Sequence, residues 1–245
     1  MNDHFIARVS SLGWWRIVAL AGVVTLAAAL VVFPEIDQGI SRLFYVPGQG
    51  FPARNGSDYH LAVRRAVRIV GWISGIALVA ALVWRVALGR ALFGVSRQAV
   101  IYLALAAALG PGVVTNAVLK EHWGRARPSQ TAMFGKTKAY TPPLLIADQC
   151  AHNCSFVSGD ASGGFIFVAF GFLAVRRIWR IAGFGLGLGL GTLFGYTRIA
   201  QGGHWFSDIV FAALFMVAVA WLLHVAVIRR DWLALPLMLL KDRGG

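Results

Sequence analysis

The stretch from residue 181 to 228 reads IAGFGLGLGLGTLFGYTRIAQGGHWFSDIVFAALFMVAVAWLLHVAVI. It contains two long apolar segments, residues 181–196 and 209–228, with a polar connector between them. A helix needs about 17–25 residues to cross the hydrocarbon core of a bilayer. The stretch therefore predicts two transmembrane helices joined by a short polar turn.

The composition of the whole chain agrees with this reading. Of the 245 residues, 58% are hydrophobic and 13% are charged, and the mean hydropathy is +0.68. A soluble domain carries roughly 25% charged residues, so a single soluble globule is excluded, as is an intrinsically disordered chain. The chain is predicted to be an integral membrane protein.

The net charge is +13, from 23 Lys and Arg against 10 Asp and Glu. In a soluble protein this excess would suggest a nucleic-acid partner. In a membrane protein, basic residues flank the spans, set their orientation and meet anionic head groups. We therefore predict a membrane-embedded chain with no nucleic-acid partner, and the sequence indicates no protein partner.

Six apolar stretches serve as membrane spans, alone or with their flanks. They cover residues 15–33, 69–84, 100–119, 162–175, 181–196 and 209–228. No repeat or low-complexity linker divides them. We predict an all-α fold, an integral membrane bundle of six transmembrane helices that forms one domain over residues 1–245.

Charge predicts the orientation of this bundle. The second and fourth connections hold no acidic residue, and their basic residues are Arg85, Arg90, Arg97, Arg176, Arg177 and Arg180. Such short basic connections lie in the cytoplasm, which puts both termini there too. The longer loops, about residues 34–68 and 120–161, then face the periplasm from a bacterial inner membrane.

Two local patterns concern packing. Four glycines recur on one face of the fifth span, where they would let a neighbouring backbone approach closely: Gly183, Gly187, Gly191 and Gly195. Residues 35–45 form either a short interfacial helix or an ordinary loop. The helix would place four apolar side chains on one face: Ile36, Ile40, Leu43 and Phe44.

Ionisable residues gather at the predicted outer ends of the last four spans. The group consists of Lys120, Arg125, Arg127, Asp160, Arg198, His204 and Asp208, with Ser158 and Gly159 beside Asp160. Charged groups at a membrane edge are costly and mark function by default. Lys and Arg bind phosphoryl groups, and the N–H groups at a helix start near Ser158 would add an anion site.

His204 and Asp208 are four residues apart, so on a helix they face the same way. The carboxylate can then accept a hydrogen bond from one imidazole nitrogen and leave the other free to attack. With the cations nearby, this arrangement suits phosphoryl transfer through a covalent phosphohistidine.

The spacings K-x6-RP from Lys120, a central Ser-Gly, and R-x5-H-x3-D from Arg198 resemble the type 2 phosphatidic acid phosphatase superfamily. The resemblance implies a six-helix membrane phosphatase that needs no metal or other cofactor. It also implies that Lys120, Arg127 and Arg198 hold the phosphate, with hydrogen bonds from Ser158 and Gly159. The resemblance further implies that His204 is the nucleophile and that Asp208 orients it.

Two positions depart from the family pattern. The third motif usually opens Ser-Arg and here opens Thr197-Arg198, which keeps the hydroxyl. The central motif is usually PSGH and here reads Val157-Ser158-Gly159-Asp160, so the family's general acid is missing. We expect Asp160 to protonate the leaving oxygen. Alternatively, Asp160 only caps the helix that begins there. His122 or His152 would then donate the proton.

Several other residues keep open interpretations. Arg125 is expected to contact the phosphate, contact a head group or be a solvated charge. Cys150 and Cys154 are expected to form a disulfide if the compartment is oxidising; the string CAHNC alternatively offers metal ligands through these cysteines and His152. Lys136 and Lys138 contact an anionic substrate or belong to a solvated loop.

The predicted function is removal of phosphate from a lipid A-type lipid at the periplasmic face. The strings FPEID, SRLFY and CSFVSGDAS are similar to bacterial lipid A phosphatases. Undecaprenyl diphosphate and phosphatidylglycerol phosphate are rival substrates. An inactive phospholipid-binding relative and a transporter, for which residues 110–112 (Gly-Pro-Gly) hint at a broken helix, are more distant alternatives.

Overall fold

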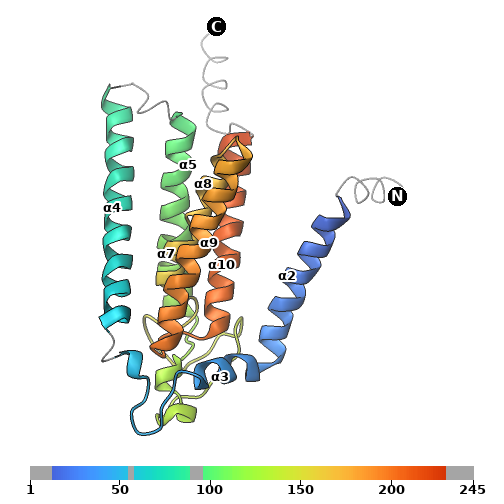
Figure 1. Cartoon of the computed structure of the whole chain (residues 1–245), viewed down its shortest axis with the longest axis vertical. Helices are drawn as coiled ribbons and strands as arrows, with labels where there is room; N and C mark the ends of the chain where they lie inside the picture. Colours follow the sequence, from blue (N-terminus) through green and yellow to red (C-terminus); the bar gives the residue numbers. More distant parts are fainter. Residues whose placement is uncertain (1–12, 55–57, 89–95, 230–245) are drawn as a thin grey trace.

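The computed structural model describes residues 13–54, 58–88 and 96–229, and within these ranges the chain is helical with no β-strand. The predicted cytoplasmic ends of the chain lie outside the described residues. The long helices alternate in direction; α4, α5, α9 and α10 lie side by side, while α2 leans away from them, and α3 and the long loops gather at one end (Figure 1). The helices are α2 (Trp14–Val32), α3 (Pro34–Arg42), α4 (Asp58–Leu88), α5 (Arg97–Ala107), η2 (Ala108–Leu119), α6 (Lys120–His122), α7 (Gly159–Phe165), α8 (Val168–Leu173), α9 (Arg177–Ala200), α10 (Phe206–Leu223) and η5 (His224–Arg229).

Three helical segments in the described part of the chain are long and apolar enough to cross a membrane: Arg97–His122, Arg177–Ala200 and Phe206–Arg229. A fourth results if the pair Ile17–Val32 and Pro34–Arg42, which meet at 77°, counts as one span. The other two predicted spans fall on α4 and on the shorter pair α7 and α8. The fold is thus all-helical and membrane-embedded, and six crossings stay a prediction.

Large apolar side chains cover the outside of the bundle. Trp14 on α2 is 77% exposed, Ile76 on α4 65% and Trp179 on α9 65%. Exposing so large an apolar surface to water is unfavourable, whereas contact with lipid tails carries no such cost. The outer surface therefore fits a lipid environment.

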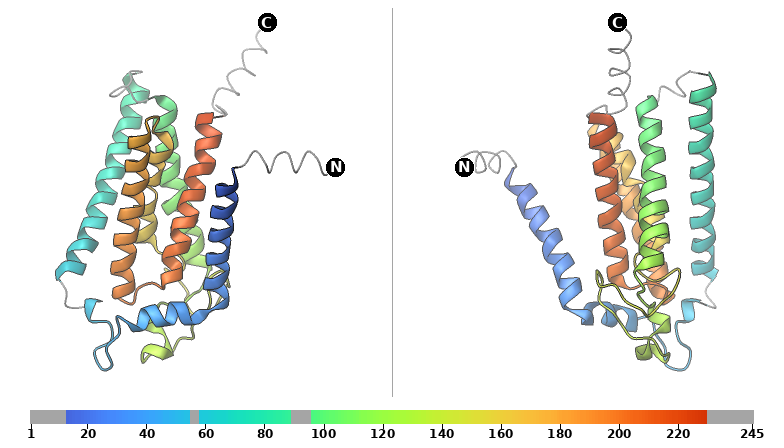
Figure 2. Two further views of the ribbon diagram at one scale, coloured as in Figure 1. Left: turned by 45° about the vertical axis from the view of Figure 1, so that its right-hand side comes forward. Right: turned by 180° about the vertical axis from the view of Figure 1, so that it is seen from behind.

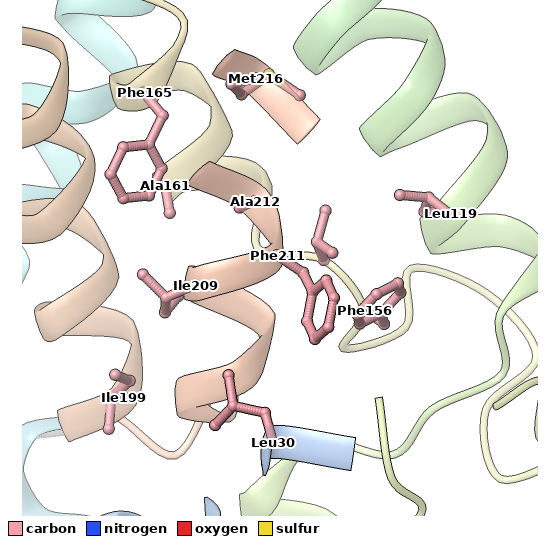
Figure 3. Packing of buried hydrophobic residues seen from close by; sticks show 11 residues of the cluster. Leu30, Leu119, Phe156, Ala161, Phe165, Ile199, Ile209, Phe211, Ala212 and Met216 are labelled. Carbon is pink, nitrogen blue, oxygen red and sulfur yellow. The ribbon is translucent and has the colours of Figure 1, made fainter. Parts of the chain in front are cut away.

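The buried core surrounds the first half of α10. Ile209, Phe211 and Met216 of this helix pack among side chains of α2, η2, α7 and α9 and against Phe156 of the loop before α7 (Figure 3). Leu30 reaches this cluster from the end of α2. α10 is therefore the central helix, and residues at its N-terminus are held from several sides.

The glycine pattern of α9 has the predicted packing role. A Cβ at Gly183 would lie 2.5 Å from the backbone nitrogen of Gly171, and one at Gly187 would clash with the backbone nitrogen of Val168. Gly191 and Gly195 meet the side chains of Phe165 and Ile209 in the same way. The prediction is confirmed: α7 and α8 approach α9 closely because these positions lack side chains.

The third predicted span runs through Pro111 without the break that a transporter would suggest. Residues from Ala108 to Leu119 form a π-helix, the wider turn in which a proline is accommodated. The carbonyl of Pro111 accepts a hydrogen bond of 2.7 Å from the side-chain amide of Asn116. The segment therefore stays one continuous helix down to the charged loop.

The segment predicted as an interfacial helix or a loop is the helix α3. Ile36, Ile40 and Phe44 pack against the core cluster as expected. Leu43 does not, since it is 79% exposed. The inward face instead includes Asp37, which is 1% exposed, and this residue belongs to the site described below.

Replacing Gly187 by alanine tests the close packing. The added methyl would force α9 away from the backbone of α8, and overpacking of this kind costs about 1–3 kcal/mol. We expect Gly187→Ala to lower the thermal denaturation midpoint of the detergent-purified protein by several degrees. Gly189→Ala on the same helix is the control, because a Cβ there meets nothing within 4 Å. Equal midpoints for both variants would contradict the packing account.

Candidate active site

His204 lies in the turn between α9 and α10 and is 1% exposed. Its Nδ1 is 2.7 Å from the carbonyl oxygen of Ser155 and 3.5 Å from Oδ2 of Asp208. A carbonyl oxygen only accepts hydrogen bonds, so Nδ1 must carry the proton and Nε2 keeps its lone pair. Burial lowers the pKa of His204, and the charges of Arg198 and Lys120 act in the same direction against Asp208. Both effects favour the neutral ring, with the proton on Nδ1 and the lone pair on Nε2.

Asp208, in the first turn of α10, is fully buried and accepts hydrogen bonds on both oxygens. Oδ2 accepts from the hydroxyl of Ser155 and, at 2.9 Å, from the backbone N–H of Trp205. Oδ1 accepts from Nη1 of Arg125. The carboxylate is thus held on several sides, with Oδ2 beside the imidazole of His204; its orienting role stays a prediction.

Arg125 has none of the three environments expected from the sequence. It is buried, with 0% of its side chain exposed, and its guanidinium joins Asp208 to Asp37 of α3. Its Nη2 is 2.7 Å from Oδ2 of Asp37. Burial opposes the charge of Arg125, but the two carboxylates outweigh it and raise the pKa. Arg125 therefore supports the site from behind and is shielded from any ligand.

Neighbouring groups complete this buried network. Asp37 accepts hydrogen bonds from the backbone N–H and the hydroxyl of Ser207, the former at 2.8 Å, and from the hydroxyl of Tyr140 at 3.1 Å. Arg125 Nε donates to the carbonyl of Thr141 at 2.7 Å. The indole of Trp205 packs edge-on against Tyr140 and donates to the carbonyl of Ala126. The network ties α3, the loop after α6 and the start of α10 together.

Lys120 and Arg127, both predicted phosphate ligands, converge on one residue. Lys120 Nζ and Arg127 Nη2 each donate to Oδ1 of Asn153 at 3.1 Å, and Arg127 also donates to the Asn153 carbonyl at 2.7 Å. Two cations that share an oxygen can equally share an oxygen of a phosphate. The structure thus brings the ends of the first motif together.

Ser158 and Gly159 lie beside Lys120. The hydroxyl of Ser158 caps α7 by accepting from the N–H of Ala161, and a Cβ at Gly159 would come 3.3 Å from Lys120 Nζ. A side chain at residue 159 would therefore crowd the ammonium group. Glycine here lets the cation approach the start of α7.

Arg198 and Asp160, from the last turn of α9 and the first turn of α7, form an ion pair. Nε of Arg198 is 3.2 Å from Oδ2 of Asp160, and Nη1 donates to the side-chain carbonyl of Gln201 at 2.8 Å. A Cβ at Gly203 would be 2.8 Å from Nη2 of Arg198. The guanidinium thus lies against the residue that precedes His204.

The structure places a disulfide between Cys150 and Cys154. Cysteines joined in this way offer no thiolates as metal ligands. Among the described residues no group of three or more His, Cys, Asp or Glu side chains could hold a metal ion. His152 instead pairs with Glu121 at 3.0 Å.

Sequence reasoning missed three residues that shape this site. Asp37 was not singled out within residues 35–45, and Ser155 and Asn153 lie in a loop without periodicity. For Asp37 a signal exists in retrospect: it is four residues before Ser41, and both are buried on the same helical face. Ser155 acts through its backbone carbonyl as well as its hydroxyl, and side-chain chemistry gives no sign of the former.

Comparison with known proteins points to one family. The sequence profile of the PAP2 superfamily matches residues 99–232. The chain is similar to three proteins named Lipid A 4′-phosphatase. One from Francisella tularensis subsp. novicida (strain U112) is 40% identical over 55% of this chain and 60% of that protein. The protein from Rhizobium leguminosarum is 32% identical over 80% of this chain and 85% of that protein. The protein from Rhizobium etli (strain ATCC 51251 / DSM 11541 / JCM 21823 / NBRC 15573 / CFN 42) is 30% identical over 82% of this chain and 82% of that protein. No solved structure gave a significant match.

Removing the charge of Arg125 tests the buried network. Arg125→Met leaves two buried carboxylates without their cation, and breaking a buried ion pair in this way costs about 3–5 kcal/mol. We expect a large drop in the thermal denaturation midpoint, and a smaller drop when Asp37→Asn is already present because one unpaired charge is then gone. Arg42→Met, at an exposed residue of α3, is the control. Equal losses in both backgrounds would contradict the coupling between Arg125 and Asp37.

Proposed function

The chain belongs to the PAP2 superfamily, and on that premise we propose that it removes the 4′ phosphate of a lipid A-type lipid through a phosphohistidine on His204. The names of the three relatives support the substrate and the position. The observation that carries the mechanism is the contact between His204 Nδ1 and the Ser155 carbonyl, which leaves Nε2 unprotonated. A neutral, oriented imidazole beside several cations is what an attacking group on a phosphate ester requires.

The first step forms a P–N bond at His204 Nε2 and breaks the P–O bond to the lipid. The departing lipid oxygen takes a proton from an acid, and a water molecule then cleaves the P–N bond to give inorganic phosphate. Lys120, Arg127 and Arg198 neutralise charge on the phosphoryl oxygens, which is where phosphoryl transfer gains most of its catalysis. N–H groups at Ser158 and Gly159 add hydrogen bonds at the start of α7.

Asp160 is the acid in this proposal. Its carboxyl group is paired with Arg198, a cation that the phosphate also needs. A bound phosphate would draw Arg198 to itself and so place the Asp160 carboxyl group beside the phosphoryl group, within reach of the leaving oxygen. His152 and His122 are weaker choices: the His152 side chain is 84% exposed and pairs with Glu121, and His122 is exposed too.

The surrounding architecture is proposed in the same terms. Six spans of one domain, residues 1–245, cross a bacterial inner membrane with both termini in the cytoplasm. The loops that carry the site then face the periplasm, where the Cys150–Cys154 disulfide is chemically stable. A membrane-embedded phosphorylated lipid reaches the site from the outer leaflet.

Phosphate release by the detergent-purified protein in EDTA tests the reaction. The substrates are lipid A, undecaprenyl diphosphate, phosphatidylglycerol phosphate and phosphatidic acid. We expect release from lipid A and, in His204→Ala, a rate below about one-thousandth of the original because the attacking group is gone. His224→Ala, at the far end of the bundle, serves as the matched control and keeps the activity.

Activity that survives in His204→Ala would exclude the phosphohistidine. Release from one of the other lipids with none from lipid A would overturn the substrate assignment alone. Saturable lipid A binding without release across pH 4–8 would instead identify an inactive lipid-binding relative, the reading favoured by Asp160 standing where the family has histidine.

The role of Asp160 is tested through the leaving group. When the leaving oxygen needs a proton, loss of the general acid lowers the reaction rate by roughly 10²–10⁴-fold. We expect Asp160→Asn to lose about this much with lipid A and far less with 4-nitrophenyl phosphate, whose leaving group departs as a stable anion. Equal losses with both substrates would assign Asp160 to phosphate-site packing. Asp160→His, which introduces the family's usual residue, should be more active on lipid A than Asp160→Asn.

A further inference from the structure

A cavity lies at the loop end of the bundle, lined by none of the candidate active-site residues described above. Its volume is about 730 Å³, within the range of roughly 300–1,000 Å³ that small-molecule sites occupy. It is lined by residues of two loops, 45–54 and 129–138. These include η1 (Pro52–Arg54) and parts of η3 (Pro128–Gln130) and η4 (Ala132–Phe134). Both loops are in the region near α3, at the same end of the bundle as the turn between α9 and α10 (Figure 2).

The cavity shares a wall with the candidate active site. The backbone N–H of Ser129 donates to the carbonyl of Gly202 at 3.0 Å, and a Cβ at Gly202 would be 2.5 Å from the ring of Phe51. The ring centroid of Phe134 is 6.2 Å from that of Trp205, the residue after His204. Phe51 and Phe134 both line the cavity. Residues 202–205 and the segment after Arg127 therefore separate the two sites.

The lining has a definite chemistry. Arg54, Lys136 and Lys138 line it, and no Asp or Glu does. Ser129, Gln130, Gln49 and Thr137 add hydroxyl and amide groups, which are the partners of sugar hydroxyls. Tyr45, Phe51 and Phe134 pack on one another with centroids 4.9–5.5 Å apart and supply an aromatic wall. Cations, amides and aromatic rings together suit a phosphorylated sugar.

The loop that carries the lysines is already shaped. Lys138 N–H donates to the carbonyl of Gln130 at 3.0 Å, and Lys136 N–H donates to that of Thr131 at 3.1 Å. Gly135 allows the turn between them with a φ of 75°. Arg54 is positioned across the cavity by its hydrogen bond of 2.8 Å to the hydroxyl of Ser129. Such a site needs little ordering when the ligand arrives.

We propose that this cavity binds the second phosphorylated sugar of the substrate's head group while His204 acts on the first phosphate. The inference rests on the proposed function, since lipid A carries phosphates at positions 1 and 4′ of its sugars. The cavity then selects a substrate with two phosphates over one with a single phosphate. A general attraction of the basic loops to anionic lipid would not make that distinction.

Kinetics with two forms of lipid A tests the selection. The substrates are lipid A with both phosphates and lipid A with the 4′ phosphate alone, each in detergent. Lys136 and Lys138 are exposed, so replacing both by methionine should leave the fold intact. Because the double variant Lys136→Met/Lys138→Met removes two cations from the cavity, we expect it to raise KM for the bisphosphate by about five- to tenfold. Its kcat, and KM for the monophosphate, should stay within about twofold of the original. Arg42→Met/Arg65→Met removes two exposed charges that do not line the cavity and is the matched control.

Equilibrium binding separates this inference from the proposed reaction. The same lipids are titrated onto His204→Ala with and without the two lysine substitutions, so that no turnover is needed. A preference for the bisphosphate that disappears with the lysines supports the cavity even if no phosphate is ever released. Equal weakening for both lipids, in binding or in KM, would overturn it in favour of a general charge effect. An unchanged preference would overturn it as well.

Discussion

The buried guanidinium of Arg125, held between Asp37 and Asp208, is the interaction on which the site depends. The three residues come from α3, the loop after α6 and the start of α10, three segments that are far apart in the sequence. Desolvation offsets much of the attraction within a buried ion pair, so its net contribution to stability is small. Breaking it is costly, however, and that asymmetry restricts these segments to one arrangement.

This arrangement determines the chemistry of His204. Because Arg125, Ser155 and the Trp205 N–H occupy the carboxylate of Asp208, that group cannot rotate away from the imidazole. Ser155 contributes twice, with its hydroxyl to Asp208 and its carbonyl to Nδ1 of His204. The proton on the ring is therefore held by a backbone atom, and in the proposed reaction the carboxylate would stabilise the positive charge that develops on the imidazole.

The sequence predicted the parts of the site whose spacing carries information. The glycine face of α9 and the apolar helices follow from periodicity and residue type. The Lys120 to Arg127 and Arg198 to Asp208 motifs were recognised by their resemblance to a known family. The environment of Arg125 was left open because residues 124–127 lie outside any helix, so no periodicity shows which side chain turns inward. Asp37 was hidden for another reason: a carboxylate on an amphipathic helix is normally a solvent-facing residue, and only its distant partners in the folded chain reverse that expectation.

The two sets of cations differ in what they contact, and the difference suits their proposed tasks. Arg125 is neutralised by carboxylates inside the protein, so an arriving anion gains little from it. Lys120 and Arg127 donate to oxygens of Asn153, which are neutral acceptors. In the proposed function, a phosphate would offer these two cations charged acceptor oxygens in place of the neutral oxygens of Asn153. On that proposal, phosphate would exchange contacts with Asn153 alone, and the buried network that positions His204 would keep its own contacts.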